Sequence, residues 1–274
     1  MQKQYFFLGG LTRSGGTLLT AILNQNPDIH VSESSPICDL TYKLNQLFNH
    51  SIEYNALPFE NRRINVLRNL INNYYYDIDS KYIIDKNQCW GTEYNISMIQ
   101  ALYGDNVKII CPVRSVLEIL SSYISLIKRN VGDISFIDRE ILSRGNINIE
   151  LEDLNDLRCE WLMSNNGTVK KQLSTLENCL RDEFKHMFHL VEYDDLINNP
   201  QKEIEKIYEF LEIDLFSHNF DNINYISKSR DSEIYGISDL HIVRGEISKT
   251  SQKFDRVLSE GIIEKYKNLE FWRI

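Results

Sequence analysis

The fold class follows from a segment that reads YFFLGGLTRSGGTLLTAIL, residues 5–23. Its apolar start, Tyr5 to Leu8, has the length of a buried strand and leads directly into two glycines. From Thr17 onward the apolar residues recur at helical spacing. We therefore predict a strand, a glycine-rich loop and a helix, an arrangement in which backbone N–H groups at the start of the helix attract an anion.

Further along the chain, strand patterns alternate with helical ones. Candidate strands lie at residues 82–84, 107–111 and 188–193, and Pro112 is expected to end the second of them. Helical patterns cover about 36–76, 115–128, 154–180 and the residues after Pro200. This alternation predicts an α/β fold with a P-loop-like, mostly parallel sheet flanked by helices. We expect one domain over residues 1–274, with about 36–80 forming a helical cap or insertion.

Composition narrows the class of protein. The 42% hydrophobic and 25% charged residues are ordinary for a soluble globular chain, and the net charge of −9 argues against a nucleic-acid partner. The five cysteines contain no C-x-x-C pair, which favours reduced thiols in a cytosol-like compartment and no zinc site. No apolar run has the length of a signal peptide core or a membrane span. We therefore expect a soluble, cytoplasmic protein without a membrane span.

The glycine loop has the outline of a phosphate-binding loop but lacks its lysine. In the Walker A pattern G-x-x-x-x-G-K-[ST], counted from Gly10, the lysine position is held by Gly16. Arg13 supplies a positive charge three residues earlier, and an arginine binds phosphate or sulfate oxygens in a fork. The segment therefore predicts an anion site, and a strand-to-helix turn without a ligand is the alternative.

The same loop resembles that of a known family. Residues 6–19, with Asn24 to Asp28 after them, are similar to the 5′-phosphosulfate loop of sulfotransferases that use 3′-phosphoadenosine 5′-phosphosulfate (PAPS), usually P-R-S-G-T-[ST]-L-L. Two positions differ, because Thr12 replaces the proline and Gly16 replaces a hydroxyl residue. The donor-binding residues that the resemblance implies here are Thr12, Arg13, Ser14, Gly15, Gly16, Thr17 and Leu18.

A second segment carries the resemblance at the end of a predicted strand. Arg114 precedes Ser122 by eight residues, the spacing with which the family holds the 3′-phosphate of the donor. The geometry is reasonable by itself, because the carboxyl end of a strand and the start of the next helix face the same crevice.

Two later segments extend the resemblance to residues 6–272. Residues 191–197 are similar to the family's Y-E-D-L segment, which implies that Tyr193 faces the nucleotide. Residues 239–245 resemble the late G-L-H-x-V-R segment of bacterial members, which implies Arg244 and Gly245 as further 3′-phosphate ligands.

The resemblance implies sulfuryl transfer from PAPS to a hydroxyl group, with 3′-phosphoadenosine 5′-phosphate (PAP) as product and no metal required. Arg13 and Lys86 are expected to hold the sulfuryl group, since Lys86 lies in a segment similar to the family's D-K-x-x-x-W. Glu33 is the first candidate for the general base, because tyrosylprotein sulfotransferases carry their catalytic glutamate near this place. His30 and His241 are the other candidates, since an imidazole titrates near neutral pH.

Two other functions remain open from the sequence. A P-loop kinase-like phosphotransferase would need Mg²⁺, but the predicted strand before Arg114 ends without an acidic residue. A non-catalytic nucleotide- or glycan-binding protein would keep the loop and lack the chemistry. The acceptor is expected to be a small-molecule, carbohydrate or peptide hydroxyl. The acidic chain disfavours a highly anionic acceptor unless that acceptor meets a local basic patch.

Overall fold

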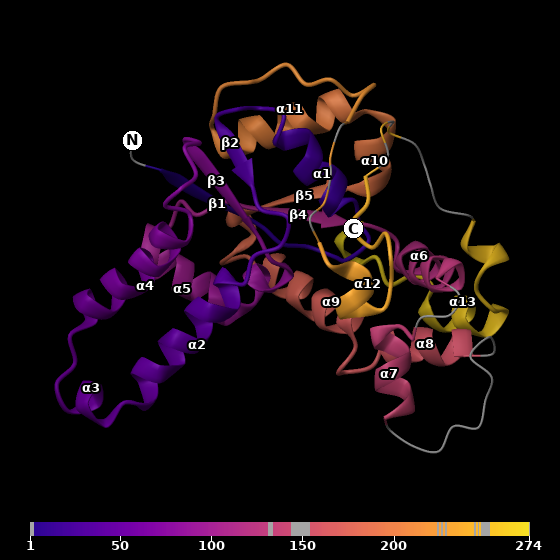
Figure 1. The fold of residues 1–274 in the computed structure, drawn as a ribbon, viewed down its shortest axis with the longest axis horizontal. Coiled ribbons are helices and arrows are strands. Elements are labelled where there is room, and N and C mark those ends of the chain that lie inside the picture. Colours follow the sequence, from indigo (N-terminus) through magenta and orange to yellow (C-terminus); the bar gives the residue numbers. More distant parts are fainter. Residues whose placement is uncertain are drawn as a thin grey trace.

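A parallel sheet lies at the centre of the computed structural model, which describes residues 3–130, 134–143, 154–223, 225, 227, 229–243, 245, 247 and 253–273. Its five strands are β1 (Gln4–Leu8), β2 (Ile29–Val31), β3 (Tyr82–Lys86), β4 (Ile109–Val113) and β5 (Phe188–Glu192). All strand pairs are parallel, and the order across the sheet is β2-β3-β1-β4-β5 (Figure 1). The predicted α/β fold with a P-loop-like parallel sheet is confirmed.

Both faces of the sheet are covered by helices, because successive strand residues point to opposite sides and both sets are apolar. Phe6 and Leu8 of β1 pack with α1 (Gly16–Leu23) and α11 (Pro200–Leu211) on one face. Phe7, between them, packs on the other face with α2 (Ile37–His50), α4 (Glu60–Tyr74) and α5 (Glu93–Tyr103). Figure 1 shows these two layers above and below the sheet.

A third apolar cluster extends the core beyond β4 and is built around α6 (Val116–Arg129). The remaining helices are α3 (Ile52–Ala56), α7 (Phe136–Leu142), α8 (Asn155–Leu162), α9 (Thr168–Cys179), α10 (Tyr193–Asn198), α12 (Asp231–Tyr235) and α13 (Glu260–Tyr266). Short 3₁₀ turns lie at Gln88–Gly91, Lys185–Met187, Phe254–Arg256 and Phe271–Arg273. Over the described ranges, every helix is too short or too polar to cross a membrane.

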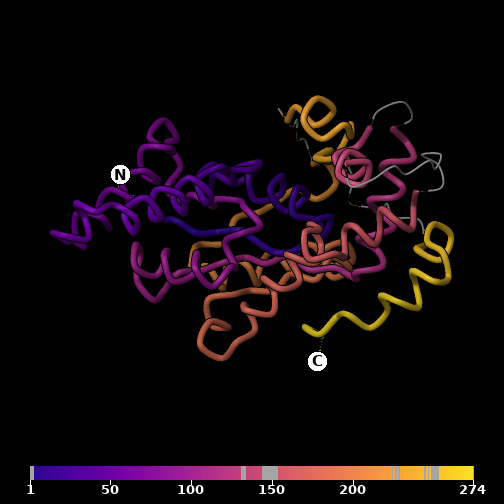
Figure 2. The backbone as a smooth tube through the Cα atoms, turned by 90° about the horizontal axis from the view of Figure 1, so that it is seen from below, coloured from indigo at the N-terminus to yellow at the C-terminus, as the bar shows by residue number. Residues whose placement is uncertain are grey.

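The segment expected as a cap or insertion contains α2, α3 and α4. These helices form an arm that extends away from the sheet, drawn in indigo and purple in Figure 2. The base of the arm is fixed by buried residues such as Ile37 and Ile71, whereas Leu47 and Ile52 near its tip are exposed.

The predicted helix over 154–180 is wrong in one respect, because the structure has two helices, α8 and α9, with a turn between them. Gly167 causes the break. A side chain on Gly167 would overlap the carbonyl oxygens of Trp161 and Leu162, so only glycine allows the chain to turn this closely around the end of α8.

The prediction that Pro112 ends its strand is also wrong, because β4 continues through Pro112 to Val113. Proline interrupts a ladder because it has no N–H to donate. Here β1 has already ended at Leu8, and the ring of Pro112 lies against Gly10 in the loop that follows. The carbonyl of Pro112 still accepts a hydrogen bond from Leu11 N (2.8 Å), so the missing donor costs little.

The last described residues return to the end of the sheet where β4 and β5 finish. Glu270 Oε1 accepts a hydrogen bond from Val116 N (3.0 Å) and so satisfies a free donor at the start of α6. Trp272 Nε1 donates to Glu192 Oε1 (2.8 Å), and Arg273 forms an ion pair with the same carboxylate (2.8 Å). The C-terminal segment therefore holds the start of α6 and the end of β5 in place.

We expect Gly167→Ala to lower the free energy of unfolding by about 3 kcal/mol, because the atoms that its Cβ meets are backbone carbonyls that cannot rotate away. Gly261→Ala is the matched control, because Gly261 lies in α13 with its nearest neighbour 3.9 Å from an added Cβ. That change should be neutral or stabilising by up to about 1 kcal/mol. Urea unfolding measures both, and equal effects of the two changes would contradict the explanation of the break.

Candidate functional site

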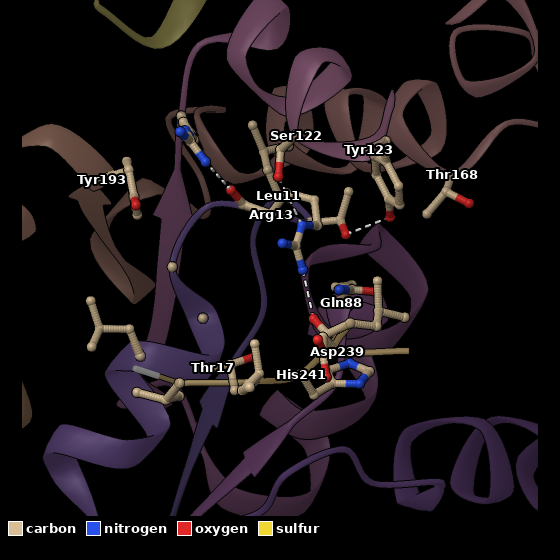
Figure 3. A pocket seen from close by; sticks show the side chains of 18 of the residues that line it. Leu11, Arg13, Thr17, Gln88, Ser122, Tyr123, Thr168, Tyr193, Asp239 and His241 are labelled. Atoms are coloured by element: carbon tan, nitrogen blue, oxygen red, sulfur yellow. Dashed lines mark hydrogen bonds between the residues drawn. The ribbon is translucent and has the colours of Figure 1, made fainter. Parts of the chain in front are cut away.

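A pocket of about 730 Å³ lies at the carboxyl ends of the strands, beside the glycine loop, residues 9–15 (Figure 3). Ligands bind at this place in open parallel sheets, because the strand order changes direction beside β1, with β2 and β3 on one side of it and β4 and β5 on the other. The register places Lys86 of β3 directly beside Leu8, the last residue of β1. None of the residues that line the pocket comes from the described arm α2–α4.

The pocket is basic although the chain is acidic. Six cationic side chains line it among the described residues, against two carboxylates, whereas the whole chain has a net charge of −9. The cations are Arg13, Lys86, Arg114, Lys128, Arg129 and Arg256, and the carboxylates are Glu33 and Asp239. Such a concentration of positive charge in a concave site attracts anions.

The backbone of the glycine loop is shaped to bind an anion. Arg13 (φ 56°) and Gly15 (φ 89°) both adopt the left-handed conformation, which turns successive N–H groups toward one point. The first hydrogen bond of α1 runs from Leu19 N to Gly15 O, so the N–H groups of the three residues before Leu19 have no acceptor within the helix. Non-glycine residues such as Arg13 rarely adopt this conformation. Those that do are often found at binding sites.

The loop is fastened on two sides. On one side, Ser14 Oγ donates to the carbonyls of Leu11 (2.5 Å) and Pro112 (3.1 Å). On the other, Thr12 N donates to Gln172 Oε1 (2.6 Å), and Thr12 Oγ1 shares a hydrogen bond with Tyr123 OH (2.8 Å). The hydroxyl of Ser14 is therefore buried within the protein, and Ser14 is the one predicted loop residue that does not line the pocket.

The side chain of Arg13 crosses the pocket. Its Nε donates to Ser122 Oγ on α6 (3.1 Å), and one terminal nitrogen donates to Leu240 O (2.6 Å), as Figure 3 shows. Burial lowers the pKa of the Arg13 guanidinium, and the charges of Arg114 and Arg129 act in the same direction. An anion bound here would offset both effects.

Arg114 lies at the end of β4, as the sequence predicted, and is held on three sides. Its guanidinium donates to Arg13 O (3.0 Å), pairs with Glu118 (3.1 Å), and lies 4.0 Å from the ring centroid of Tyr193. An added Cβ on Gly15 would lie 2.9 Å from Tyr193, so the tyrosine also fixes the position of the glycine loop. The structure thus brings Arg114 and Tyr193 to the same pocket as the loop.

Lys86 is the buried cation whose surroundings point most directly to a ligand. Its Nζ atom is buried and has no hydrogen-bond partner among the described residues. Burial lowers its pKa to about 8, although the charge of Glu33 acts to raise it. An ideal Cβ on Gly16 would lie 3.7 Å from Lys86 Cε. The end of the Lys86 side chain therefore lies beside Gly16, the position that a Walker A loop gives to its lysine. The residues present therefore fit a bound anion.

The three candidate bases occupy different places. Glu33 lines the pocket, accepts a hydrogen bond from Ser227 Oγ (2.9 Å), and also borders a second cavity of about 370 Å³. His30 lines only the second cavity, where burial lowers its pKa. His241 lines the main pocket, and Asp231 Oδ1 holds its Nδ1 (2.7 Å). The structure therefore brings Glu33 and His241, but not His30, to the main pocket.

Asp231 was not identified from the sequence, because no local motif joins it to His241. Its second oxygen accepts the backbone N–H of His241 (2.9 Å), so the carboxylate fixes both the ring and the main chain. Burial acts to raise the pKa of Asp231, but hydrogen bonds from Ser229 and His241 outweigh it and lower that pKa. An ionised Asp231 leaves Nε2 of His241 as the ring nitrogen available to the pocket.

The two phosphate ligands predicted in the last segment have different outcomes. Arg244 lies outside the described residues. Gly245 is described but does not line the pocket, and its carbonyl accepts a hydrogen bond from Ile223 N (2.8 Å).

Sequence reasoning also missed three further cations that line the pocket. Lys128 and Arg129 end α6, a position where basic residues are common for helix-dipole reasons alone. Arg256 ends the 3₁₀ turn Phe254–Arg256, which carries no sequence motif. Only the spacing of Arg129 from Ser122, seven residues along one helix face, could have suggested a shared site.

A known protein family matches most of this chain. Residues 6–217 match a family model described as "Sulfotransferase family". No curated protein matches the chain. The fold is similar to the solved sulfotransferase domain from the curacin biosynthetic pathway, at 15% identity and TM-score 0.53, over 98% of this chain and 92% of that one.

Weaker structural matches include a sulfotransferase from Alicyclobacillus acidocaldarius, at 13% identity and TM-score 0.49, over 80% of this chain and 85% of that one. The sulfotransferase domain of the Synechococcus PCC 7002 olefin synthase matches at 17% identity and TM-score 0.45, over 79% of this chain and 76% of that one.

The lowered pKa of Lys86 predicts how anion binding depends on pH. Below about pH 8 the ammonium is already charged, so affinity for inorganic sulfate should be nearly constant. Above that pH, binding must take up a proton, and affinity should fall up to about ten-fold per pH unit. Calorimetric titration in two buffers of different ionisation enthalpy measures both the affinity and the proton uptake.

Lys86→Arg is the control, because arginine stays charged and should remove the pH dependence while keeping sulfate affinity. Lys86→Met should lower affinity at pH 7 and also remove the pH dependence. An unchanged pH profile in either variant would show that Lys86 does not contact the anion.

Proposed function

The chain belongs to the sulfotransferase family, and on that premise we propose that it transfers a sulfuryl group from PAPS to a hydroxyl group of an acceptor. The observation that carries the proposal is the buried, unpartnered Nζ of Lys86 beside the start of α1, within the described residues. A charge of this kind is costly unless a ligand neutralises it. The donor's phosphosulfate is an anion of the required kind.

The proposed donor site holds the two anionic groups of PAPS, the phosphosulfate and the 3′-phosphate, with different residues. The N–H groups at the start of α1, with Arg13 and Lys86, hold the phosphosulfate. Arg114 and Ser122 hold the 3′-phosphate, and Tyr193 lies beside Arg114 to support it. The other proposed donor contacts are the backbone of Thr12, Ser14, Gly15, Gly16, Thr17 and Leu18, with Arg244 and Gly245 as candidates from the family resemblance.

The chemistry needs charge stabilisation and one base. Bound PAPS supplies the sulfuryl group, whose sulfur bonds to the acceptor oxygen as its bond to the bridging phosphate oxygen breaks, which leaves PAP. Arg13 and Lys86 stabilise the negative charge on the bridging and sulfuryl oxygens. Glu33 takes the proton from the acceptor hydroxyl. Glu33 is the first choice because it lies close enough to Lys86 to affect the pKa of that lysine.

His241 is the second candidate base, and its geometry favours it in a different way. Asp231 fixes the ring through Nδ1, so Nε2 is available to accept a proton. Substituting each residue in turn and following the acid limb of the pH–rate profile separates the two candidates.

We expect the protein to bind PAP in the presence of a chelator. Arg114→Ala should weaken that binding about 10- to 100-fold, because it removes a charged hydrogen-bond donor to the 3′-phosphate, and Ser122→Ala should weaken it less. Lys202→Ala is the control, since Lys202 is exposed on α11, outside the pocket. Calorimetric titration measures the affinities, and thermal unfolding confirms that each variant is folded. Tighter binding of ATP with Mg²⁺ than of PAP would favour the kinase-like alternative.

Arg13→Ala should lower the rate of PAP release from PAPS about 10²- to 10³-fold with a panel of hydroxyl acceptors, while the affinity for PAP falls much less. Glu33→Gln should lower the rate and remove the acid limb of the pH profile if Glu33 is the base. If His241→Asn removes that limb instead, the base is His241. A wild-type protein that binds PAP but never turns over PAPS would support the non-catalytic alternative.

A further inference from the structure

A group of three cations lines the pocket at the end of α6 and on the turn packed against it. This cationic cluster consists of Lys128 and Arg129 at the end of α6 and Arg256 on the 3₁₀ turn Phe254–Arg256, which packs against α6. All three are exposed and line the pocket. Within the described part of the chain, none of them forms an ion pair or a hydrogen bond. The donor site proposed above uses none of them.

Building on the proposed function, we propose that the acceptor carries an anionic group, a phosphate or a carboxylate, which the cationic cluster binds. The acceptor's hydroxyl would then lie toward Lys86 and Glu33, and its anion toward Arg129. The proposal names a substrate class that the family assignment alone leaves open.

The helix geometry separates the cluster from the proposed 3′-phosphate site. Ser122, Ser125 and Arg129 line the pocket at spacings of three and seven residues, so they share one face of α6. Arg129 lies about 10 Å beyond Ser122 along that face, at 1.5 Å per residue. Arg114 lies on the other side of Ser122, before the helix begins. A single phosphate held between Arg114 and Ser122 therefore does not account for the cluster.

An aromatic wall forms part of the pocket lining. The rings of Phe136 and Tyr235, which both line the pocket, lie 6.0 Å apart at 73°. The ring of Tyr235 in turn lies 6.3 Å from that of His241. A hydroxyl compound with a flat apolar body would contact this wall while its anion reaches the cluster.

Charge makes the cluster selective. A chain with a net charge of −9 repels anions over most of its surface, so an anionic acceptor needs local positive charge to enter. A neutral acceptor gains nothing from three cations that have no ion-pair partner among the described residues. Because these cations are exposed, they cost little when no ligand is bound.

The test uses a pair of probes that differ in charge and have nearly the same shape, 4-hydroxyphenylacetate and 4-hydroxyphenylacetamide. Each is titrated by calorimetry into the PAP-saturated protein. We expect the carboxylate to bind about ten-fold more tightly than the amide, because three exposed ion contacts each contribute a factor of about two. Added salt should reduce that preference. Glycerol 3-phosphate and glycerol repeat the comparison for a phosphate.

The triple variant Lys128→Gln/Arg129→Gln/Arg256→Gln should bind both members of each pair equally and keep the wild-type affinity for PAP. Lys202→Gln, which removes an exposed cation outside the pocket, should keep the preference. Thermal unfolding checks that the triple variant is folded, and the three single variants should each lose part of the preference.

Two results would overturn the proposal. One is a wild-type protein without preference for the anionic probes, or a preference that the triple variant keeps. The other is a loss of PAP affinity in the triple variant, which would assign the cluster to the donor. Failure of the proposed function looks different, because wild-type protein would then not bind PAP, and the same probes titrated into nucleotide-free protein would still report on the cluster.

Discussion

The pocket depends on the contact between the glycine loop and β4 at Pro112. Gly10 can lie against Pro112 because it has no side chain, and the carbonyl of Pro112 accepts hydrogen bonds from Leu11 N and Ser14 Oγ. This contact sets where the loop turns, so it also fixes the left-handed Arg13 and the start of α1. Arg114, two residues after Pro112, then donates to the carbonyl of Arg13. Strand, loop and both arginines therefore form one unit.

Within that unit, the electrostatic design combines two kinds of cation. Arg114 is held by Glu118 and Tyr193 and so has a fixed position before any ligand arrives. Lys86 is buried with no partner among the described residues, so its charge is unstable until an anion binds. A preorganised arginine provides geometry, and an unsatisfied lysine provides binding energy. Both are needed if the same site is to bind a donor and later release its product.

The sequence was informative where local patterns determine structure. Buried strands, the glycine loop and the positions of Arg13 and Arg114 follow from short motifs, and the predicted sulfotransferase resemblance is confirmed by the family match. Gly167 was overlooked because its role depends on carbonyls at the end of α8, which only the folded chain brings close. The pairing of Asp231 with His241 and the position of Arg256 beside α6 also arise from tertiary packing. Local periodicity carries no information about such contacts.

The C-terminal contacts have a consequence for how the chain folds. Glu270 bonds the start of α6 across 154 residues, and Arg13 bonds Leu240 across 227 residues. Contacts between segments so far apart in the chain close late, because their loop-closure entropy is paid before they give any stability. The sheet can form once β5 has been synthesised, whereas the pocket is complete only when the final segment has docked. A growing chain on the ribosome would thus form its sheet before its binding site.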